Sequence, residues 1–294
     1  MKSEIFQKSF PVTDYDLAAT LISGQAFRWR CRDDRWESVI DSRWVSLRQE
    51  KNQITAQTVA PAADWQCLKN YLQLEINLPQ VIATFPDDEP MRTAVASCRG
   101  LRLLRQNPWE CLASFILSST KQIVQIQQIV ALLCERFGEA VSVPKGHEPV
   151  FSFPSFQRIA GLTETELRNC KMGFRAPYLL GTAKMLVNNE VDLEKLHRCQ
   201  VEGARTELLK FPGVGRKIAD CVLLFAYGFQ EAFPVDVWVI KALRELYFPK
   251  RNVKLKRLQK FSQTHFGPNA GYAQQYLFHY MRTKKLSAPS RLRG

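Results

Sequence analysis

Two patterns of hydrophobic and polar positions divide this chain. Within residues 1–80, the two kinds alternate over short segments bounded by polar turns, which is typical of half-buried β-strands. After an acidic segment, Pro86–Pro90, which we interpret as a linker, apolar residues recur with helical spacing. We therefore expect an α+β protein in which a small N-terminal antiparallel β-sheet domain with helices precedes a mainly α-helical domain. The predicted strands are Phe27–Arg30, Trp36–Ile40, Trp44–Leu47 and Gln53–Thr58.

The helical pattern continues almost to the C-terminus. The length of 294 residues suits two domains, and we place their boundary so that the sheet domain covers residues 1–95 and the helical domain residues 96–294. The predicted helices are Trp109–Leu117, Ile123–Phe137, Glu164–Cys170, Ala176–Asn188, Ala204–Lys210, Arg216–Tyr227, Val237–Tyr247 and Tyr272–Arg282.

The positive charge lies in the helical part. Residues 1–95 carry 11 Lys+Arg and 13 Asp+Glu, a net charge of −2, whereas the remainder carries 30 and 15, a net charge of +15. A single basic cluster such as Lys250–Lys260 is commonly only a solvated surface. An excess across a whole domain favours a polyanionic partner, and we expect nucleic acid.

Several classes of protein are excluded by the composition. No run of about 18 apolar residues could span a membrane, and the polar N-terminus is unlike a signal peptide. The eight cysteines contain no Cys-x-x-Cys pair and the four histidines are scattered, so we expect no metal and no other cofactor. Unpatterned cysteines are typical of a reducing compartment. We expect a cytoplasmic monomer.

The most informative stretch is Leu208–Cys221, in which Pro212 and Gly213 interrupt two helical segments. Glycines at 213 and 215 permit positive φ and leave backbone N–H groups pointing outward beside the start of a helix. Such a loop binds phosphate without reading base sequence. A plain corner between two helices is the alternative. In a basic domain, we favour contact of Gly213, Val214 and Gly215 with the DNA backbone.

This hairpin, followed by a loop that ends in an aspartate within Phe233–Val237, resembles the signature of the helix-hairpin-helix DNA glycosylases. The resemblance is closest to the 8-oxoguanine DNA glycosylases and covers about residues 15–283 in unbroken order. It implies a bifunctional DNA glycosylase and abasic-site lyase of base excision repair that acts on double-stranded DNA containing 8-oxoguanine. Four further segments support it: Leu21–Trp29, Leu101–Cys111, Met172–Ala176 and Ala270–Gln274.

Lys217 matches the nucleophilic lysine of that family. A protonated lysine cannot attack a sugar carbon, but the positive helix end after Gly215, the neighbouring Arg216 and a dry pocket would each favour the neutral amine. The resemblance implies that Lys217 attacks C1′, forms a Schiff base and nicks the strand by β-elimination. A phosphate-binding surface lysine is the alternative.

Asp236 directly precedes the predicted Val237–Tyr247 helix, where an aspartate is a good N-cap. In the family, the matching aspartate caps its helix and also supports the positive charge that develops on the sugar. The resemblance therefore implies a catalytic role for Asp236, whereas the residues alone favour the cap.

The target base must leave the duplex to be reached. Cys221 lies four residues after Lys217, and Phe278 four after Gln274, so each pair shares a helical face. The resemblance implies that Cys221 and Phe278 sandwich the flipped purine while Gln274 binds its Watson–Crick edge. A buried thiol, a core aromatic and a surface amide are the alternatives.

Recognition of 8-oxoguanine depends on N7, which carries a hydrogen in the lesion and a lone pair in guanine. A fixed carbonyl oxygen accepts a hydrogen bond from the lesion and repels guanine, and such a misplaced acceptor costs about 1–3 kcal/mol. The resemblance assigns this carbonyl to Gly24, in the sheet domain. A tight turn is the alternative reason for a glycine there.

The residues that would contact the opposite strand match the family pattern only in part. Arg175 matches an arginine that contacts the unpaired opposite base, with phosphate binding as the alternative, and the adjacent Phe174 either stacks on a base or lies in the core. Thr120 and Gln125 stand where the eukaryotic pattern has an asparagine and an arginine, and Trp238 replaces a phosphate-binding histidine. We predict relaxed opposite-base selectivity.

The source and two competing functions complete the prediction. A Pro-Val-Asp-Val-Trp sequence also occurs in bacterial relatives, so we expect a bacterial protein that associates with the nucleoid when bound to DNA. Two other functions are the alternatives. A water-using alkylpurine glycosylase would not need Lys217, so this lysine argues against it. A non-catalytic DNA-binding module would not need Asp236, so this aspartate argues against that function. Iron–sulfur relatives are excluded, because no cysteine follows Cys221.

Overall fold

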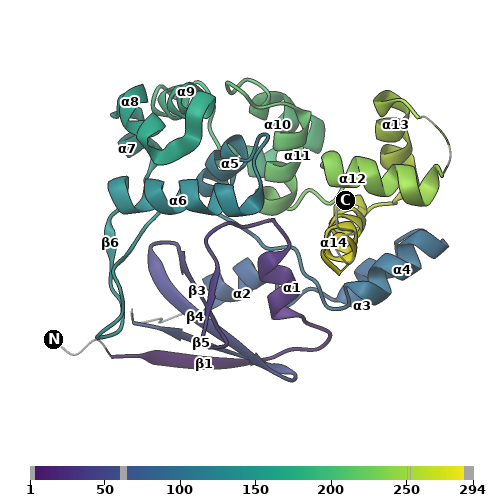
Figure 1. The fold of residues 1–294 in the computed structure, drawn as a ribbon, viewed down its shortest axis with the longest axis horizontal. Coiled ribbons are helices and arrows are strands. Elements are labelled where there is room, and N and C mark those ends of the chain that lie inside the picture. The colour runs from purple at the N-terminus through teal and green to yellow at the C-terminus, as the bar shows by residue number, and fades with distance from the viewer. Residues whose placement is uncertain (1–3, 60–64, 250, 252, 288–294) are drawn as a thin grey trace, which may run out of the picture.

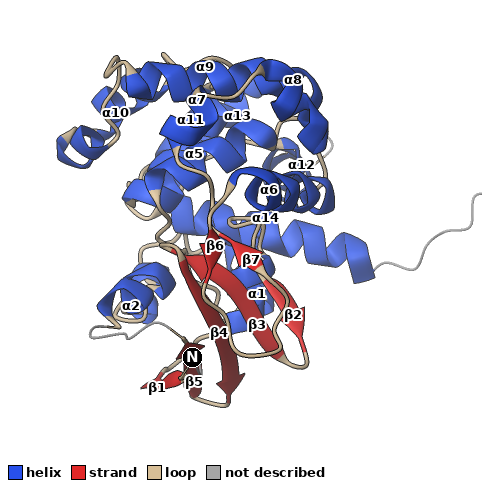
Figure 2. Cartoon of the chain, turned by 90° about the vertical axis from the view of Figure 1, so that its left-hand side faces the viewer, coloured by secondary structure: helices blue, strands red, loops and turns tan. Residues whose placement is uncertain are grey.

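The computed structural model describes residues 4–59, 65–249, 251 and 253–287. Its main sheet is antiparallel with the strand order β1-β5-β4-β3-β2 (Figure 1). A short second ladder, β6 with β7, rises from this sheet towards the helices (Figure 2). The strands are β1 (Phe6–Pro11), β2 (Arg30–Arg32), β3 (Arg35–Ile40), β4 (Arg43–Glu50), β5 (Gln53–Thr58), β6 (Ala140–Val141) and β7 (Val150–Phe151).

One short helix lies between β1 and β2 in the chain, and the others follow the main sheet. Most of the helices lie above and beside the sheet in Figure 1. The helices are α1 (Leu17–Ile22), α2 (Gln66–Leu72), α3 (Leu78–Ile82), α4 (Glu89–Ser97), α5 (Pro108–Leu117), α6 (Ile123–Phe137), α7 (Phe156–Ala160), α8 (Glu164–Leu167), α9 (Ala176–Val187), α10 (Val201–Leu208), α11 (Arg216–Val222), α12 (Val237–Ala242), α13 (Leu255–His265) and α14 (Ala270–Ser287). Tighter 3₁₀ turns span Gly173–Arg175 and Glu194–Arg198, and wider π-helical turns span Arg168–Met172, Leu223–Tyr227 and Leu243–Tyr247.

The predicted fold class, an antiparallel sheet domain followed by a mainly helical domain, is confirmed. All the predicted helices are present, with ends shifted by a few residues, and three of the predicted strands coincide with β3, β4 and β5. No helix in the described ranges is long and apolar enough to cross a membrane.

Two hydrophobic cores build the molecule. The smaller one packs the inner face of the sheet, including Leu47 and Ile54, against Leu17 and Leu21 of α1. The larger one surrounds α5, in which every residue from Trp109 to Leu117 is buried except Glu110. An apolar helix surrounded on all sides in this way is fixed by packing, so the residues that follow its C-terminal end have a firm support.

Two sequence predictions are wrong, and both errors have a physical cause. The strand expected at Phe27–Arg30 begins only at Arg30, because Phe27 packs in the larger core and Trp29 in the smaller one, so the segment crosses between cores. The segment Pro86–Pro90 is not a linker. Asp88 within it accepts a hydrogen bond from the Met91 N–H at 2.8 Å and caps α4. The domain boundary at residue 95 stays a prediction.

Candidate active site

An open cleft of about 960 Å³ lies where α5, α6, α11, α12 and α14 meet the loop after α1. Most predicted site residues line it, although they come from distant parts of the sequence: Gly24, Thr120, Lys217, Cys221, Asp236, Trp238, Gln274 and Phe278. Within the described part of the chain, no group of metal-binding side chains gathers here or elsewhere. The fold thus brings an amine, a carboxylate and a base-sized apolar wall to one place.

Lys217 lies in the first turn of α11, directly after the hairpin. Its Nζ donates a hydrogen bond to the Ser118 Oγ at 3.2 Å and lies 5.2 Å from the ring centre of Phe115. Both contacts come from the C-terminal end of α5. Nowhere among the described residues does a carboxylate form an ion pair with this amine, so the lysine is not held by a structural salt bridge.

Asp236 caps α12, as the sequence predicts, because its Oδ1 accepts a hydrogen bond from the Val239 N–H at 2.8 Å. Burial raises the pKa of this carboxyl group above its usual value, although the Val239 hydrogen bond and the charges of Lys217 and Arg282 oppose the shift. The carboxylate and the amine therefore influence each other across the cleft without a direct ion pair.

The proposed base-binding side chains differ in what they offer a ligand. Burial raises the pKa of the Cys221 thiol to about 12, so the sulfur is neutral and suits an apolar contact. Gln274 is only 3% exposed, and its Oε1 accepts no hydrogen bond from the described residues. A buried amide oxygen without a donor costs about 1–3 kcal/mol, which a ligand bearing N–H groups would recover.

The Gly24 loop shows a second unpaired acceptor. The carbonyl groups of Ile22, Ser23 and Gln25 each accept a hydrogen bond from a side chain. In the described ranges the Gly24 carbonyl accepts none, and Gly24 is one of the residues that line the cleft. Gly24 itself has a φ of +80°, which a side chain would disfavour.

The hairpin loop Gly213–Gly215 does not line the cleft and differs from the prediction in detail. Gly213 has a φ of +75°, whereas Gly215 does not use the positive φ that a glycine permits, since it is extended at −95° and caps α11. Val214 is buried and its N–H donates to the Phe211 carbonyl at 3.1 Å. In the described structure the N–H groups of both glycines remain unpaired and available to phosphate.

Arg175 and Phe174 do not line the cleft. Phe174 is 51% exposed, so the alternative that it belongs to the core is wrong. Arg175 is 2% exposed, donates to the Thr120 Oγ1 and lies with its guanidinium 4.2 Å from the ring centre of Phe174. The arginine predicted to meet the opposite base is therefore buried behind Thr120 and Phe174 in this structure.

Two family models together match nearly the whole chain. The model of the 8-oxoguanine DNA glycosylase N-terminal domain matches residues 9–112, and that of the HhH-GPD superfamily base excision DNA repair proteins matches residues 113–266. The chain belongs to the 8-oxoguanine DNA glycosylase family. The predicted enzyme class, a bifunctional N-glycosylase/DNA lyase, is thereby confirmed.

Individual relatives match this chain over most of their length. This glycosylase is 30% identical to a probable N-glycosylase/DNA lyase from Methanothermobacter thermautotrophicus, across 94% of this chain and 96% of the relative. It is 32% identical to N-glycosylase/DNA lyase OGG1 of Arabidopsis thaliana, across 92% and 80%. Among solved structures, the 8-oxoguanine glycosylase/lyase of Clostridium acetobutylicum, bound to double-stranded DNA with cytosine opposite the lesion, has a TM-score of 0.88 at 29% identity across 96% and 98%.

A 3-methyladenine DNA glycosylase from Archaeoglobus fulgidus shares the fold, with a TM-score of 0.77 at 23% identity across 94% and 98% of the two chains. The fold alone therefore does not separate the oxidised-guanine and alkylpurine enzymes. Substrate choice has to be argued from the side chains of the cleft.

Among the cleft residues that sequence reasoning missed, Phe115, Ser118 and Arg282 lie next to predicted site residues. Ser118 and Phe115 contact Lys217 from α5, and no local sequence signal connects positions so far apart. Arg282 could have been found, because it lies four residues after Phe278 and so continues the same helical face.

Proposed function

We propose that this glycosylase excises 8-oxoguanine from duplex DNA through a Schiff base on Lys217. The flipped base lies between Cys221 and Phe278, its Watson–Crick N–H groups donate to the Gln274 Oε1, and its N7 hydrogen is donated to the Gly24 carbonyl. The observation that carries this proposal is a pair of unpaired acceptors on two residues, Gly24 and Gln274, that line the same cleft as the amine. 8-Oxoguanine has donors on both of these edges, whereas guanine has none at N7.

The chemistry uses the lysine twice. The neutral amine of Lys217 forms a bond to C1′ while the C1′–N9 bond breaks and its electron pair leaves with the base, which takes up a proton. Opening of the sugar ring at O4′ then gives the protonated Schiff base, and loss of a C2′ proton expels the 3′ phosphate by β-elimination. Asp236 stabilises the positive charge on the sugar during the first step.

Borohydride trapping tests the proposal under single-turnover conditions on an 8-oxoguanine duplex. The wild type is expected to release the base, nick the strand and form a covalent protein–DNA adduct. Lys217→Gln should abolish the adduct and the nick, because an amide cannot form a Schiff base, whereas Lys184→Gln at an exposed position of α9 should keep both.

Each contrary outcome has its own meaning. Adduct that persists in Lys217→Gln would show that another amine is the nucleophile. Base release by the wild type without any adduct would indicate a water-using glycosylase, and binding without base release would indicate a passive DNA-binding module.

We also propose that this glycosylase has a relaxed preference for the base opposite the lesion. Gln125 accepts a hydrogen bond from the Gln122 N–H at 3.1 Å and so completes the cap of α6, while Thr120 accepts one from Arg175. Neither side chain offers the charge of an arginine to the opposite base. Single-turnover excision opposite C, A, G and T is expected to agree within about tenfold, or 1.4 kcal/mol, and excision opposite C alone would contradict this.

A further inference from the structure

Two side chains of α14 hold the loop that carries Gly24. Arg282 donates from Nη1 to the Ile22 carbonyl at 3.3 Å, and Gln275 donates from Nε2 to the Ser23 carbonyl at 2.9 Å. The same helix carries the glutamine and the phenylalanine of the proposed base pocket. Helix α14 therefore supplies two side chains of the proposed base pocket and also holds the Gly24 loop in place.

Arg282 contacts both the Gly24 loop and Phe278. Its guanidinium carbon is 5.4 Å from the ring centre of Phe278. A Cβ atom added to Gly24 would lie 3.2 Å from the Arg282 Nη1 and 3.2 Å from the Phe278 Cε1, so both side chains pack directly against the loop. In the described part of the chain Arg282 forms no ion pair, and its charge is thus not used by a structural salt bridge.

We propose that Arg282 is a positioning residue that sets the discrimination between 8-oxoguanine and guanine. This inference rests on the proposed function, since it concerns the acceptor at Gly24. An acceptor repels the guanine N7 only if it cannot move away, and a free loop would relax by the few tenths of an ångström that remove the repulsion. By binding the Ile22 carbonyl while its guanidinium lies over the Phe278 ring, Arg282 prevents that movement.

The geometry requires an arginine rather than any cation. A planar guanidinium can stack on an aromatic face and donate to a carbonyl at the same time, whereas the ammonium of a lysine is a single point charge on a flexible stem. Arg282→Lys should therefore lose the restraint while it keeps the charge near Asp236. Arg282→Met should lose both.

The test measures binding and lyase activity separately. In a Lys217→Gln background, the ratio of the Kd values for guanine and 8-oxoguanine duplexes is expected to fall about tenfold in both Arg282 variants, which is the scale of one hydrogen bond to a charged group. With Lys217 intact, Arg282→Lys should reduce cleavage of a preformed abasic duplex less than it reduces 8-oxoguanine excision, because the abasic substrate has no base for Gly24 to recognise.

Lys284→Met, which removes a charge from an exposed position of the same helix, serves as the control and should leave the Kd ratio unchanged. An unchanged ratio in the Arg282 variants would overturn the proposal. So would a loss of abasic-site cleavage in Arg282→Lys as large as its loss of 8-oxoguanine excision, since Arg282 would then act on catalysis. Failure of the proposed function itself is distinguishable, because the wild type would then not excise 8-oxoguanine at all.

Discussion

At the residue scale, the cleft joins a structural role and a chemical role in Asp236. Its side chain caps α12 through the Val239 N–H, and its charge faces Lys217 without an ion pair. An asparagine is as good an N-cap as an aspartate but carries no charge. The two roles can therefore be separated by one substitution.

Asp236→Asn is expected to keep the fold and to slow base release by about 10²–10³-fold, the loss seen when one group that stabilises transition-state charge is removed. Thermal unfolding and single-turnover excision measure the two effects. Asp16→Asn provides a matched control, because Asp16 caps α1 through the Ala19 N–H at 2.8 Å outside the cleft. Equal rates of excision by Asp236→Asn and the wild type would show that Asp236 has no catalytic role.

The direction of the Asp236 pKa shift predicts a pH effect on the same reaction. Burial raises the pKa of this carboxyl group, and excision needs its ionised form. On acidification, excision should therefore fall at a pH above the ordinary aspartate pKa of about 3.9, and Asp236→Asn should lack this fall. Since the folded-state pKa is the higher one, protonation of Asp236 does not destabilise the fold, so the loss should precede unfolding.

At the element scale, the two glycines of the hairpin serve different purposes. Gly213 has positive φ, and a Cβ atom there would lie 2.5 Å from the Tyr178 Cδ2. Gly215 is extended, and a Cβ atom there would meet only open space. The fold therefore requires a glycine at position 213. It does not require one at position 215, where the absence of a side chain would instead allow DNA to approach the backbone.

Gly213→Ala should accordingly lower the free energy of unfolding by about 1–3 kcal/mol, through backbone strain and the clash with Tyr178. Gly215→Ala should unfold like the wild type but bind DNA more weakly, because its methyl group faces the approaching phosphate. Urea denaturation and DNA-binding titrations separate the two. If Gly213→Ala melts like the wild type, or Gly215→Ala binds with unchanged affinity, this division is wrong.

The elements that sequence could predict are those with a local pattern. Helices such as α6 and α14 are long enough for their apolar spacing to show, whereas α1 and α3 have six and five residues and show little. Strand β1 was not predicted, because its support is the distant β5, with Phe6 opposite Thr58. The segment around Arg28 has the alternating pattern of a strand, but it is not one, because its neighbours Phe27 and Trp29 pack in different cores.

At the scale of the whole molecule, the site exists only because the two cores are joined. The resemblance named Gly24 and Phe278, and the structure brings them together from opposite ends of the chain. No sequence pattern could show that the Gly24 carbonyl is unpaired or that Arg175 is buried, because both depend on contacts between distant segments. The concentration of positive charge in the helical part predicts a nucleic acid partner but not the place where it binds.

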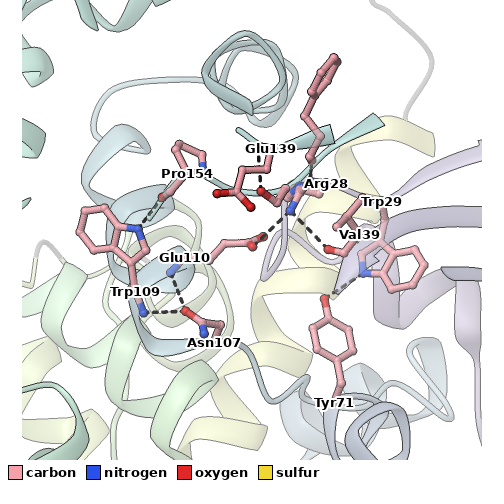
Figure 3. Close-up of polar contacts among 11 residues, drawn as sticks. Arg28, Trp29, Val39, Tyr71, Asn107, Trp109, Glu110, Glu139 and Pro154 are labelled. Atoms are coloured by element: carbon pink, nitrogen blue, oxygen red, sulfur yellow. Dashed lines mark hydrogen bonds and ion pairs between the residues drawn. The ribbon is translucent and has the colours of Figure 1, made fainter. Parts of the chain in front are cut away.

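The join itself rests partly on Arg28, which lies between the sheet and α5 (Figure 3). Its Nη1 is 3.3 Å from the Glu110 Oε2 and 3.3 Å from the Val39 carbonyl oxygen, and its Nη2 donates to the Phe151 carbonyl. The side chains of Arg28 and Glu110 are 12% and 26% exposed. Burial raises the pKa of Glu110, and the charge of Arg28 and its hydrogen bond oppose that shift.

Removal of either Arg28 or Glu110 alone should therefore lower the free energy of unfolding strongly, and removal of both should lower it much less. Glu110→Gln leaves Arg28 charged without its carboxylate and should lower the free energy of unfolding by about 3 kcal/mol, whereas Arg28→Met with Glu110→Leu should recover most of that loss. Glu148→Gln breaks the exposed pair with Arg32 and should leave the free energy of unfolding nearly unchanged, because solvent screens this pair. Urea denaturation followed by tryptophan fluorescence and circular dichroism measures these values. If Glu110→Gln costs no more than Glu148→Gln, the ion pair does not join the cores, and Gly24 is held in place by packing and by α14 alone.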